Sequence, residues 1–387
     1  MLKTKKTFLL IYLFGFLWAF SMALPSYIQS SFLGQFVGVR FIGIFIAIAT
    51  AITLVVQFFY PRVIKELTNY KASILLIIIY IISTLLLAFL GSWFTVLLFY
   101  IVHFICLSLF AVNLDVFLED ITDNKHAGHV RTTFLTTANI AWVLAPLSMG
   151  FLAKGNNYSL VYIVASLIVI PMIFILMYAK RNMSDKKMTY KDRNFKQLIT
   201  VFERNKNIRE IFQVAFVLRF FYCIMVLYIP IYLHEYIGFS WSEIGIIFTI
   251  MLLPFIIFQI PAGNIADKYI GEKEILVLGL LIMMTATGAI FFITSSNLIV
   301  WAAILFMTRV GASLVEAMQD VYFFKQINGH DMDLIDMFRN VRPLAWLLGS
   351  IFSLIILEIF PIQFLFLFLA VVILMGLRPV FLLEDTK

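Results

Sequence analysis

The chain has 387 residues, of which 62% are hydrophobic and only 13% are charged. A soluble globular protein of this length needs more polar surface, so the composition excludes that class and indicates an integral membrane protein. The formal net charge of +7 does not indicate nucleic-acid binding, because the basic residues stand in short runs between apolar segments.

The sequence gives no sign of a bound metal, cofactor or nucleotide. Cys106 and Cys223 both fall inside apolar stretches, so neither a disulfide framework nor a thiolate metal site is supported. The sequence contains no G-x-x-x-x-G-K-[S/T] phosphate-binding loop, so ATP is not the expected energy source. We therefore expect no cofactor.

Several apolar segments reach the length of about 20 residues that a membrane-spanning helix needs. They are continuous runs without the alternation of a β-strand, and lipid admits only helices or closed barrels. Lys3, Lys5 and Lys6 precede the first segment, which lacks a cleavage site and is expected to be retained. The twelve expected spans are 7–31, 40–61, 72–91, 93–118, 130–153, 158–179, 210–234, 241–266, 274–294, 297–324, 338–358 and 361–383.

The basic residues fix the expected orientation of these spans. With the amino terminus inside, the external loops receive only Arg40 and Lys154, and Arg219 and Arg309 lie within spans. The other 25 of the 29 basic residues then face the cytoplasm, as the positive-inside rule requires. We predict a multi-pass protein of the cytoplasmic membrane with both termini in the cytoplasm.

One long polar interval, residues 180–209, divides the chain into two apolar halves. Its basic residues far outnumber its acidic residues, which places it on the cytoplasmic side. The predicted domains are an amino-terminal six-helix bundle at 1–179, a cytoplasmic basic linker at 180–209, and a carboxy-terminal six-helix bundle at 210–387. The linker is either a solvated tether or an amphipathic segment on the inner leaflet.

The two halves resemble each other at corresponding positions from the first to the fifth span. Because each half has six spans, the repeats share one orientation, and a solute site is expected between them. The matched positions are Pro25 with Pro230, Ile42-Gly43-Ile44 with Ile244-Gly245-Ile246, Gln57 with Gln259, Asp115 with Asp320, and Trp142 with Trp346.

The segment between the eighth and ninth spans carries a family signature. It places Gly263 four residues before Asp267, followed by Lys268, Gly271 and Lys273. This resembles the G-x-x-x-D-[R/K]-x-G-[R/K]-[R/K] motif of the major facilitator superfamily, with one extra residue before the last glycine. The resemblance in topology covers nearly the whole chain and implies an all-α membrane protein with twelve transmembrane helices as two six-helix repeats.

A second motif lies in the fifth span. Ala145-Pro146-Leu-Ser-Met149-Gly150 is similar to the G-P-x-x-G-G motif of this superfamily's drug/proton antiporters, with Ala145 and Met149 in place of glycines. The resemblance implies an antiporter. The alternative is a kinked helix whose proline and glycine serve packing only.

Four charged or histidine residues lie deep within the predicted spans, away from their ends, where facing lipid would cost about 2.5–3.5 kcal/mol or more. Arg219 is in the seventh span, His103 in the fourth, and Arg309 and Glu316 in the tenth. These spans line the central cavity in the superfamily, so an arginine is a candidate solute ligand, and Glu316 or His103 a candidate proton carrier. The alternative is an internal ion pair of Arg309 with Glu316, with or without Arg219, that only holds helices together.

Two further groups of candidates complete the predicted site. Trp18 and Gln29 lie on one stripe of the first span and could line the same cavity, although an aromatic residue in an apolar helix usually packs. Charged and glycine residues near the cytoplasmic ends are expected to form a gate, with Lys268 paired to Asp320, and surface fraying as the alternative. The gate candidates are Asp115, Arg131, Gly263, Asp267, Lys268, Asp320 and Arg339.

The sequence therefore predicts a secondary active transporter that moves a small-molecule solute by alternating access, with the proton as the expected coupling ion. The expected surroundings are the lipid bilayer, with no nucleic acid, and the expected state is a monomer. Two alternatives from other classes are a membrane-embedded enzyme acting on a lipid diphosphate, indicated faintly by Asn113 to Asp120, and a transporter-like sensor that does not transport.

Overall fold

The computed structural model describes residues 5–89, 91–121, 127–155, 157–179, 205–327 and 332–384. These residues are helical apart from turns and one isolated β-bridge, between Lys154 and Asn157. The chain divides into two compact units, which we describe separately. Unit 1 comprises Met1–Thr189 with Ser240–Ile246, and unit 2 comprises Tyr190–Phe239 with Ile247–Lys387. Most of the predicted 180–209 linker lies outside the described residues.

Eleven helices in the described part of the chain are long and apolar enough to cross a membrane. The remaining predicted span corresponds to α6 (Ala127–Leu152), whose apolar part, Thr136–Leu152, is shorter. Because α6 has 26 residues in all, and a helix rises about 1.5 Å per residue, its length still suffices to cross a bilayer. The predicted all-α membrane fold is confirmed.

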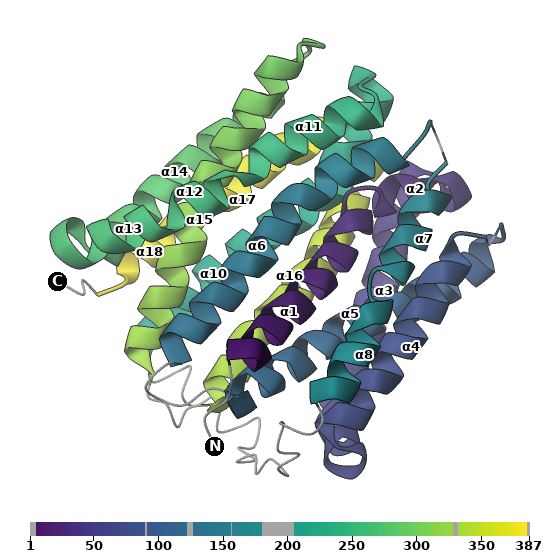
Figure 1. The fold of residues 1–387 in the computed structure, drawn as a ribbon. Helices are drawn as coiled ribbons and strands as arrows, with labels where there is room; N and C mark the ends of the chain where they lie inside the picture. The colour runs from purple at the N-terminus through teal and green to yellow at the C-terminus, as the bar shows by residue number, and fades with distance from the viewer. Residues whose placement is uncertain are drawn as a thin grey trace. The chain divides into compact units, whose positions relative to one another are not determined.

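Unit 1 contains the first half of the chain (Figure 1). In it α1 packs along α6, and α4 packs along α5. The first predicted span is two helices, because the chain turns after Ser26, where the N–H of Ile28 donates to the carbonyl of Pro25 at 3.0 Å. Its elements are α1 (Lys5–Ser26), α2 (Gln29–Val37), η1 (Val39–Phe41), α3 (Ile42–Leu67), α4 (Asn69–Leu87), α5 (Trp93–Ile121), α6, α7 (Ser159–Leu167) and α8 (Ile170–Ala179).

Unit 1 also includes the start of α11, which meets α6 through two glycines. A methyl group placed on Gly150 would lie 2.7 Å from the carbonyl oxygen of Trp241, and one placed on Gly245 would lie 2.6 Å from that of Pro146. Backbone atoms cannot give way as a flexible side chain can, so this crossing requires glycine at both positions. The last glycine of the degraded motif in the fifth span therefore has a packing role.

Unit 2 contains the second half of the chain. In it α14 packs along both α15 and α17, and α10 packs along α16 (Figure 1). Two segments, η2 and η3, are wider π-helices, and η3 carries Asp267 and Lys268 of the family signature. Its elements are α10 (Lys206–Ile231), η2 (Tyr232–Ile237), the part of α11 (Trp241–Leu252) from Ile247 onward, α12 (Pro254–Ile257), α13 (Gln259–Ile265), η3 (Ala266–Ile270), α14 (Glu272–Ile290), α15 (Leu298–Gln326), α16 (Met332–Ile359), α17 (Phe364–Met375) and α18 (Leu377–Leu382).

Helices α4 and α14 begin at equivalent places in the two repeats, after a residue with positive φ. Gly271 precedes α14 with φ 84° and ψ 167°, and Thr68 precedes α4 with φ 71° and ψ 151°. This region of backbone space is open to glycine and strained for a residue with a β-carbon. The backbone conformation therefore explains the glycine of the signature. Thr68 adopts a similar conformation in unit 1 although it has a β-carbon.

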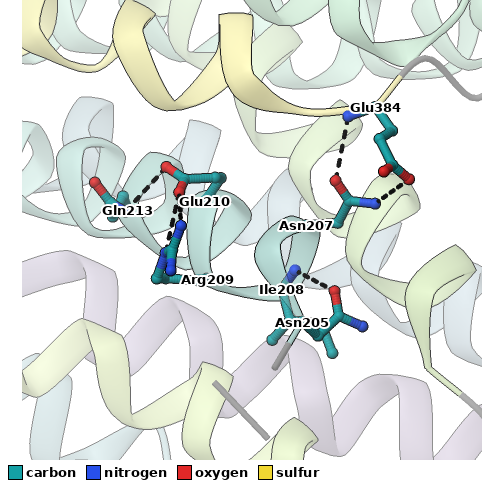
Figure 2. A network of polar contacts seen from close by, with 7 residues as sticks. All are labelled: Asn205, Asn207, Ile208, Arg209, Glu210, Gln213 and Glu384. Atoms are coloured by element: carbon teal, nitrogen blue, oxygen red, sulfur yellow. Dashed lines mark hydrogen bonds and ion pairs between the residues drawn. The ribbon is translucent and has the colours of Figure 1, made fainter. Parts of the chain in front are cut away.

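The end of α18 is held inside unit 2 by polar contacts (Figure 2). The side chain of Asn207 donates to Oε2 of Glu384 at 2.8 Å and accepts from the backbone N–H of Glu384 at 3.2 Å. Tyr322 donates to the carbonyl of Glu384 at 3.0 Å, and Lys273 donates to that of Leu383 at 2.8 Å. The starts of α10 and α14 and the end of α15 are thereby tied to the end of α18.

Candidate functional site

An ion pair joins α10 and α15 in unit 2. Nη1 of Arg219 donates to Oε1 of Glu316 at 2.8 Å, and the hydroxyl of Tyr222 donates to Oε2 at 3.3 Å. Both side chains of the pair are 24% exposed. Since both helices are candidate spans, this carboxylate lies within the membrane region, and its side chain is only partly buried.

Arg309 lies two turns before Glu316 on α15, but the two do not form the direct ion pair that was the alternative to a solute site. Its guanidinium carbon instead lies 4.9 Å from the ring centre of Phe221 and 5.5 Å from that of Tyr222. The residue is 1% exposed, and Nη1 has no hydrogen-bond partner among the described residues. Ring faces attract a cation but carry no net charge, so they do not neutralise this guanidinium.

Two more charged residues act on the Arg219–Glu316 pair. Arg342 of α16 is exposed and interacts electrostatically with Arg219, Glu316 and Tyr222. Asp320, one turn after Glu316 on α15, is half-buried and interacts electrostatically with Arg219. One charged cluster therefore contains the three residues of the predicted stripe on α15, Arg309, Glu316 and Asp320. Arg219 of α10 joins them, because it pairs with Glu316 and interacts with Asp320.

Unit 1 places the other predicted ligands in a neutral cluster. His103 is 3% exposed, its Nδ1 lies 2.7 Å from Oγ1 of Thr84, and its ring stacks on Tyr80 with centres 5.1 Å apart. Trp18 is 3% exposed and packs on Tyr80 and Phe110, at 5.0 and 4.1 Å between ring centres. The packing alternative therefore describes Trp18 in this structure.

Gln29 belongs to the same half of the molecule. It is 9% exposed, and its Oε1 accepts a hydrogen bond from the hydroxyl of Tyr100 at 2.9 Å. The ring of Tyr100 in turn lies 6.2 Å from that of His103. His103 and Gln29 are thus linked through one tyrosine, and each already has a polar partner.

The gate candidates are described only in part. The side chains of Asp115, Arg131 and Asp267 lie outside the described residues. Lys268 and Arg339 are exposed, and Gly263 has open space around the position of a β-carbon. The pairing of Lys268 with Asp320 stays a prediction.

Sequence reasoning missed the aromatic residues of the charged cluster. Tyr222 lies three residues after Arg219, on the same face of α10, and Phe221 precedes it. In a span rich in aromatic residues, neither stands out by composition, since 16% of the whole chain is aromatic. The available signal was the spacing of a hydroxyl group one helical turn from an intramembrane arginine.

Comparison with known proteins decides the family. The Major Facilitator Superfamily matches residues 7–341 of the chain. The chain belongs to this superfamily. The predicted fold of two six-helix repeats is thereby confirmed, and the protein is a membrane transporter. The alternative of an enzyme acting on a lipid diphosphate is wrong.

A solved structure has a similar fold over nearly the whole chain. A bacterial homologue of the human lysosomal transporter Spinster, crystallised in an inward-facing and unoccupied conformation, matches with a TM-score of 0.72. The match covers 98% of this chain and 94% of that one, at 13% sequence identity. A comparison with curated protein sequences finds no match. Within the described residues, this facilitator has no group of three His, Cys, Asp or Glu side chains placed to hold a metal ion.

Proposed function

We propose that this protein is a secondary active transporter of the cytoplasmic membrane, and that it couples solute movement to protons at Glu316. The observation that carries the proposal is the Arg219–Glu316 ion pair, formed between two candidate spans and exposed at 24% on each side chain. An ionisable pair in a span is expensive, and one that solvent reaches is able to exchange a proton. We further propose that it works as a monomer and that a small-molecule solute shares this site.

Protonation of Glu316 has a defined effect on its bond to Arg219. A proton on Glu316 removes the charge that binds Nη1 of Arg219, so the 2.8 Å charge-assisted bond weakens to a neutral one. Arg219 is then free to donate to a solute. Deprotonation restores the pair and returns the guanidinium to Glu316. Proton binding and solute binding are therefore linked through one carboxylate, and linkage is reciprocal.

Alternating access is supported by the internal repeat. Transporters built from repeats move one half against the other around a fixed site. Each half here is a compact unit with its own buried core, which is what a rigid-body motion requires. The charged cluster belongs wholly to unit 2, and the corresponding neutral cluster belongs to unit 1.

The test uses full-length protein in liposomes. Solutes are first selected by a thermal-stability screen, since a ligand that binds the folded state raises the unfolding midpoint. Glu316→Gln is expected to abolish uphill movement of such a solute driven by a pH gradient, while counterflow exchange without a gradient continues. Arg378→Gln, an exposed cation of α18 outside the cluster, serves as the control and should retain both. Uphill transport by Glu316→Gln at the wild-type rate would overturn the coupling assignment.

The same assay gives the direction of coupling. The motif of the fifth span resembles that of antiporters, in which solute moves against the proton flux, whereas release of Arg219 by protonation of Glu316 favours symport, in which both move together. Uphill movement toward the alkaline side identifies symport, and movement toward the acidic side identifies antiport. A solute that binds and yet never moves in either assay would instead support the sensor alternative.

The orientation proposed from the basic residues has its own test. Both termini and the 180–209 linker are expected in the cytoplasm. A membrane-impermeant thiol reagent applied to intact cells should label Lys154→Cys and should miss Lys187→Cys until the cells are opened. The two native cysteines are buried, which keeps the background low. The reverse labelling pattern would invert the topology.

A further inference from the structure

The charged cluster of unit 2 contains more cations than anions. Its guanidinium groups come from three helices: Arg219 on α10, Arg309 on α15 and Arg342 on α16. Its carboxylates are Glu316, which is bound to Arg219, and Asp320, which interacts with Arg219 electrostatically. The described residues therefore leave one positive charge without a counter-charge. In a region of low dielectric constant such a charge attracts an anion strongly.

Arg309 is the buried cation of the cluster that lacks a counter-charge. Its side chain is buried with 1% exposure, and Nη1 has no hydrogen-bond partner among the described residues. Its contacts with Phe221 and Tyr222 are to ring faces. A buried donor without an acceptor is costly and is rarely kept without a reason. Burial under the rings makes Arg309 a source of positive potential rather than the group that touches a ligand.

Arg342 supplies the accessible donors. It is exposed, and it interacts with both members of the ion pair and with Tyr222. Arg219 has further guanidinium donors beyond the one that Glu316 accepts. An apolar surface lies beside these donors, because the ring of Tyr222 is 6.3 Å from that of Phe255 and 5.6 Å from the guanidinium carbon of Arg219.

We infer that this cluster binds a small organic anion, with Arg342 and Arg219 donating to its carboxylate or phosphate group and the Tyr222 and Phe255 rings contacting its apolar part. The inference rests on the proposed function in that the bound anion is the solute. A cationic solute would meet net repulsion here, because Glu316 is already engaged by Arg219. A neutral solute would leave Arg309 without its counter-charge.

The test is the thermal stability of the purified full-length protein with four probes of the same ring. Benzoate and phenyl phosphate carry the two anionic groups, benzamide is neutral, and benzylamine is cationic. We expect the unfolding midpoint to rise with one or both anions and to stay unchanged with the other two. The stronger anion identifies the carboxylate or the phosphate class. Equal stabilisation by benzamide, or no stabilisation by either anion, would overturn the inference.

Variants then locate the binding in the cluster. Arg342→Gln should weaken the affinity of the stabilising anion about tenfold or more, because a charge-assisted donor is lost. Arg378→Gln, which also removes one cation from unit 2, should leave that affinity unchanged. Arg342 is chosen for this test because it is exposed, whereas a substitution at the buried Arg309 risks preventing folding. Equal loss of affinity in Arg342→Gln and Arg378→Gln would mean a nonspecific effect of net charge and would reject the site.

Glu316→Gln separates this inference from the proposed function. It removes a negative charge from the cluster, so anion affinity should rise even though pH-driven transport is lost. Anion binding without proton-driven uphill transport in the wild type would reject the proposed coupling and keep the anion site. Proton-driven uphill transport of a neutral solute, with no anion binding, would reject the anion site and keep the proposed coupling.

Discussion

The two halves of the molecule repeat one architecture and fill it with different chemistry. In the register that matches Pro25 with Pro230 and Asp115 with Asp320, Arg219 corresponds to Phe14 and Arg309 to Phe104. Phe14 is 3% exposed and packs on Phe110 with ring centres 5.7 Å apart. At these two positions, where unit 2 has a guanidinium, unit 1 therefore has an aromatic ring.

The same contrast holds at the start of the third helix of each repeat. Asn69 begins α4 and donates to the backbone carbonyl of Asn113 on α5 at 3.3 Å. Glu272 begins α14, is 1% exposed, and forms an ion pair with Lys325 on α15. Unit 1 therefore has a neutral hydrogen bond where unit 2 has a salt bridge with a buried carboxylate and a partly exposed lysine.

This difference separates structural from responsive polar groups. The neutral bonds of unit 1, such as Tyr60 to Asn113 at 2.8 Å and Asn113 to Ser73 at 2.8 Å, keep their strength when a proton or an ion arrives. The charged contacts of unit 2 change strength whenever Glu316 or a ligand changes its charge. Among these contacts, all between described residues, those that depend on charge lie in unit 2.

The largest expected effect comes from moving a unit 2 charge into unit 1. Phe14→Arg places a guanidinium among Phe110 and Phe117 with no carboxylate of the described neighbours to receive it. An unpaired cation there should cost about 3 kcal/mol or more. We expect almost no monodisperse protein by size-exclusion chromatography. Phe14→Leu, the matched control, should lose about 1 kcal/mol and still purify.

Normal yield and stability of Phe14→Arg would contradict the contrast between the halves. It would mean that the unit 1 interior is wet enough to hold a charge. The position would then behave like its unit 2 counterpart.

The sequence predicted the fold more fully than the contacts within the site, and the reason is physical. Hydrophobic runs of spanning length, the basic loops and the repeat register predicted the fold, because lipid leaves the backbone few alternatives. The candidate residues were chosen because charges within spans are rare, and Arg219, Arg309 and Glu316 do lie in one cluster. Periodicity along α15 could not show which arginine reaches Glu316, since that depends on the packing of α10 against α15.

The aromatic partners were beyond sequence reasoning for the same reason. The roles of Tyr222 and Phe221 come from their contacts across helices, and an apolar span contains many equivalent-looking rings. Likewise, the stripe of the first span made Trp18 a candidate for lining the cavity, whereas its contacts in the structure are packing contacts with Tyr80 and Phe110. A residue type that both packs and binds cannot be assigned from its spacing alone.

The second expected effect concerns the Arg219–Glu316 pair itself. Arg219→Gln leaves the carboxylate with Tyr222 as its remaining direct donor among the described contacts, and Glu316→Gln leaves the guanidinium unpaired. Each single variant should lower the unfolding midpoint, and the double variant should recover part of the loss. A coupling of about 0.5–3 kcal/mol is expected, because the residues are in contact. Thermal unfolding of all four proteins in one detergent measures it.

The double variant also separates a structural pair from a coupling site. If the pair only holds α10 and α15 together, restoring stability restores transport. We expect stability to recover and proton-driven uphill transport to stay absent, because no titratable carboxylate is left at position 316. Recovery of both in the double variant would rule out Glu316 as the proton carrier.

The third expected effect concerns the strained start of α4, where the stabilising substitution is the smallest change expected. Thr68 has φ 71° and ψ 151°, close to the values of Gly271 at the equivalent place in unit 2. A residue with a β-carbon in this region carries strain of about 1–3 kcal/mol, whereas glycine does not. Gly271→Thr should therefore destabilise the protein by about that amount. Thr68→Gly should stabilise it by a smaller amount, about 1 kcal/mol, since glycine also loses more backbone entropy on folding.

Thr68→Ala separates the strain from the side chain's own contribution. Oγ1 of Thr68 is buried and has no hydrogen-bond partner among the described residues, so removing the hydroxyl alone is expected to help slightly. Alanine keeps the β-carbon and therefore the strain, while glycine removes both. Unfolding midpoints should rank glycine above alanine and alanine at or above threonine. If alanine matched glycine, the backbone at Thr68 would carry no strain, and the hydroxyl alone would separate the start of α4 from that of α14.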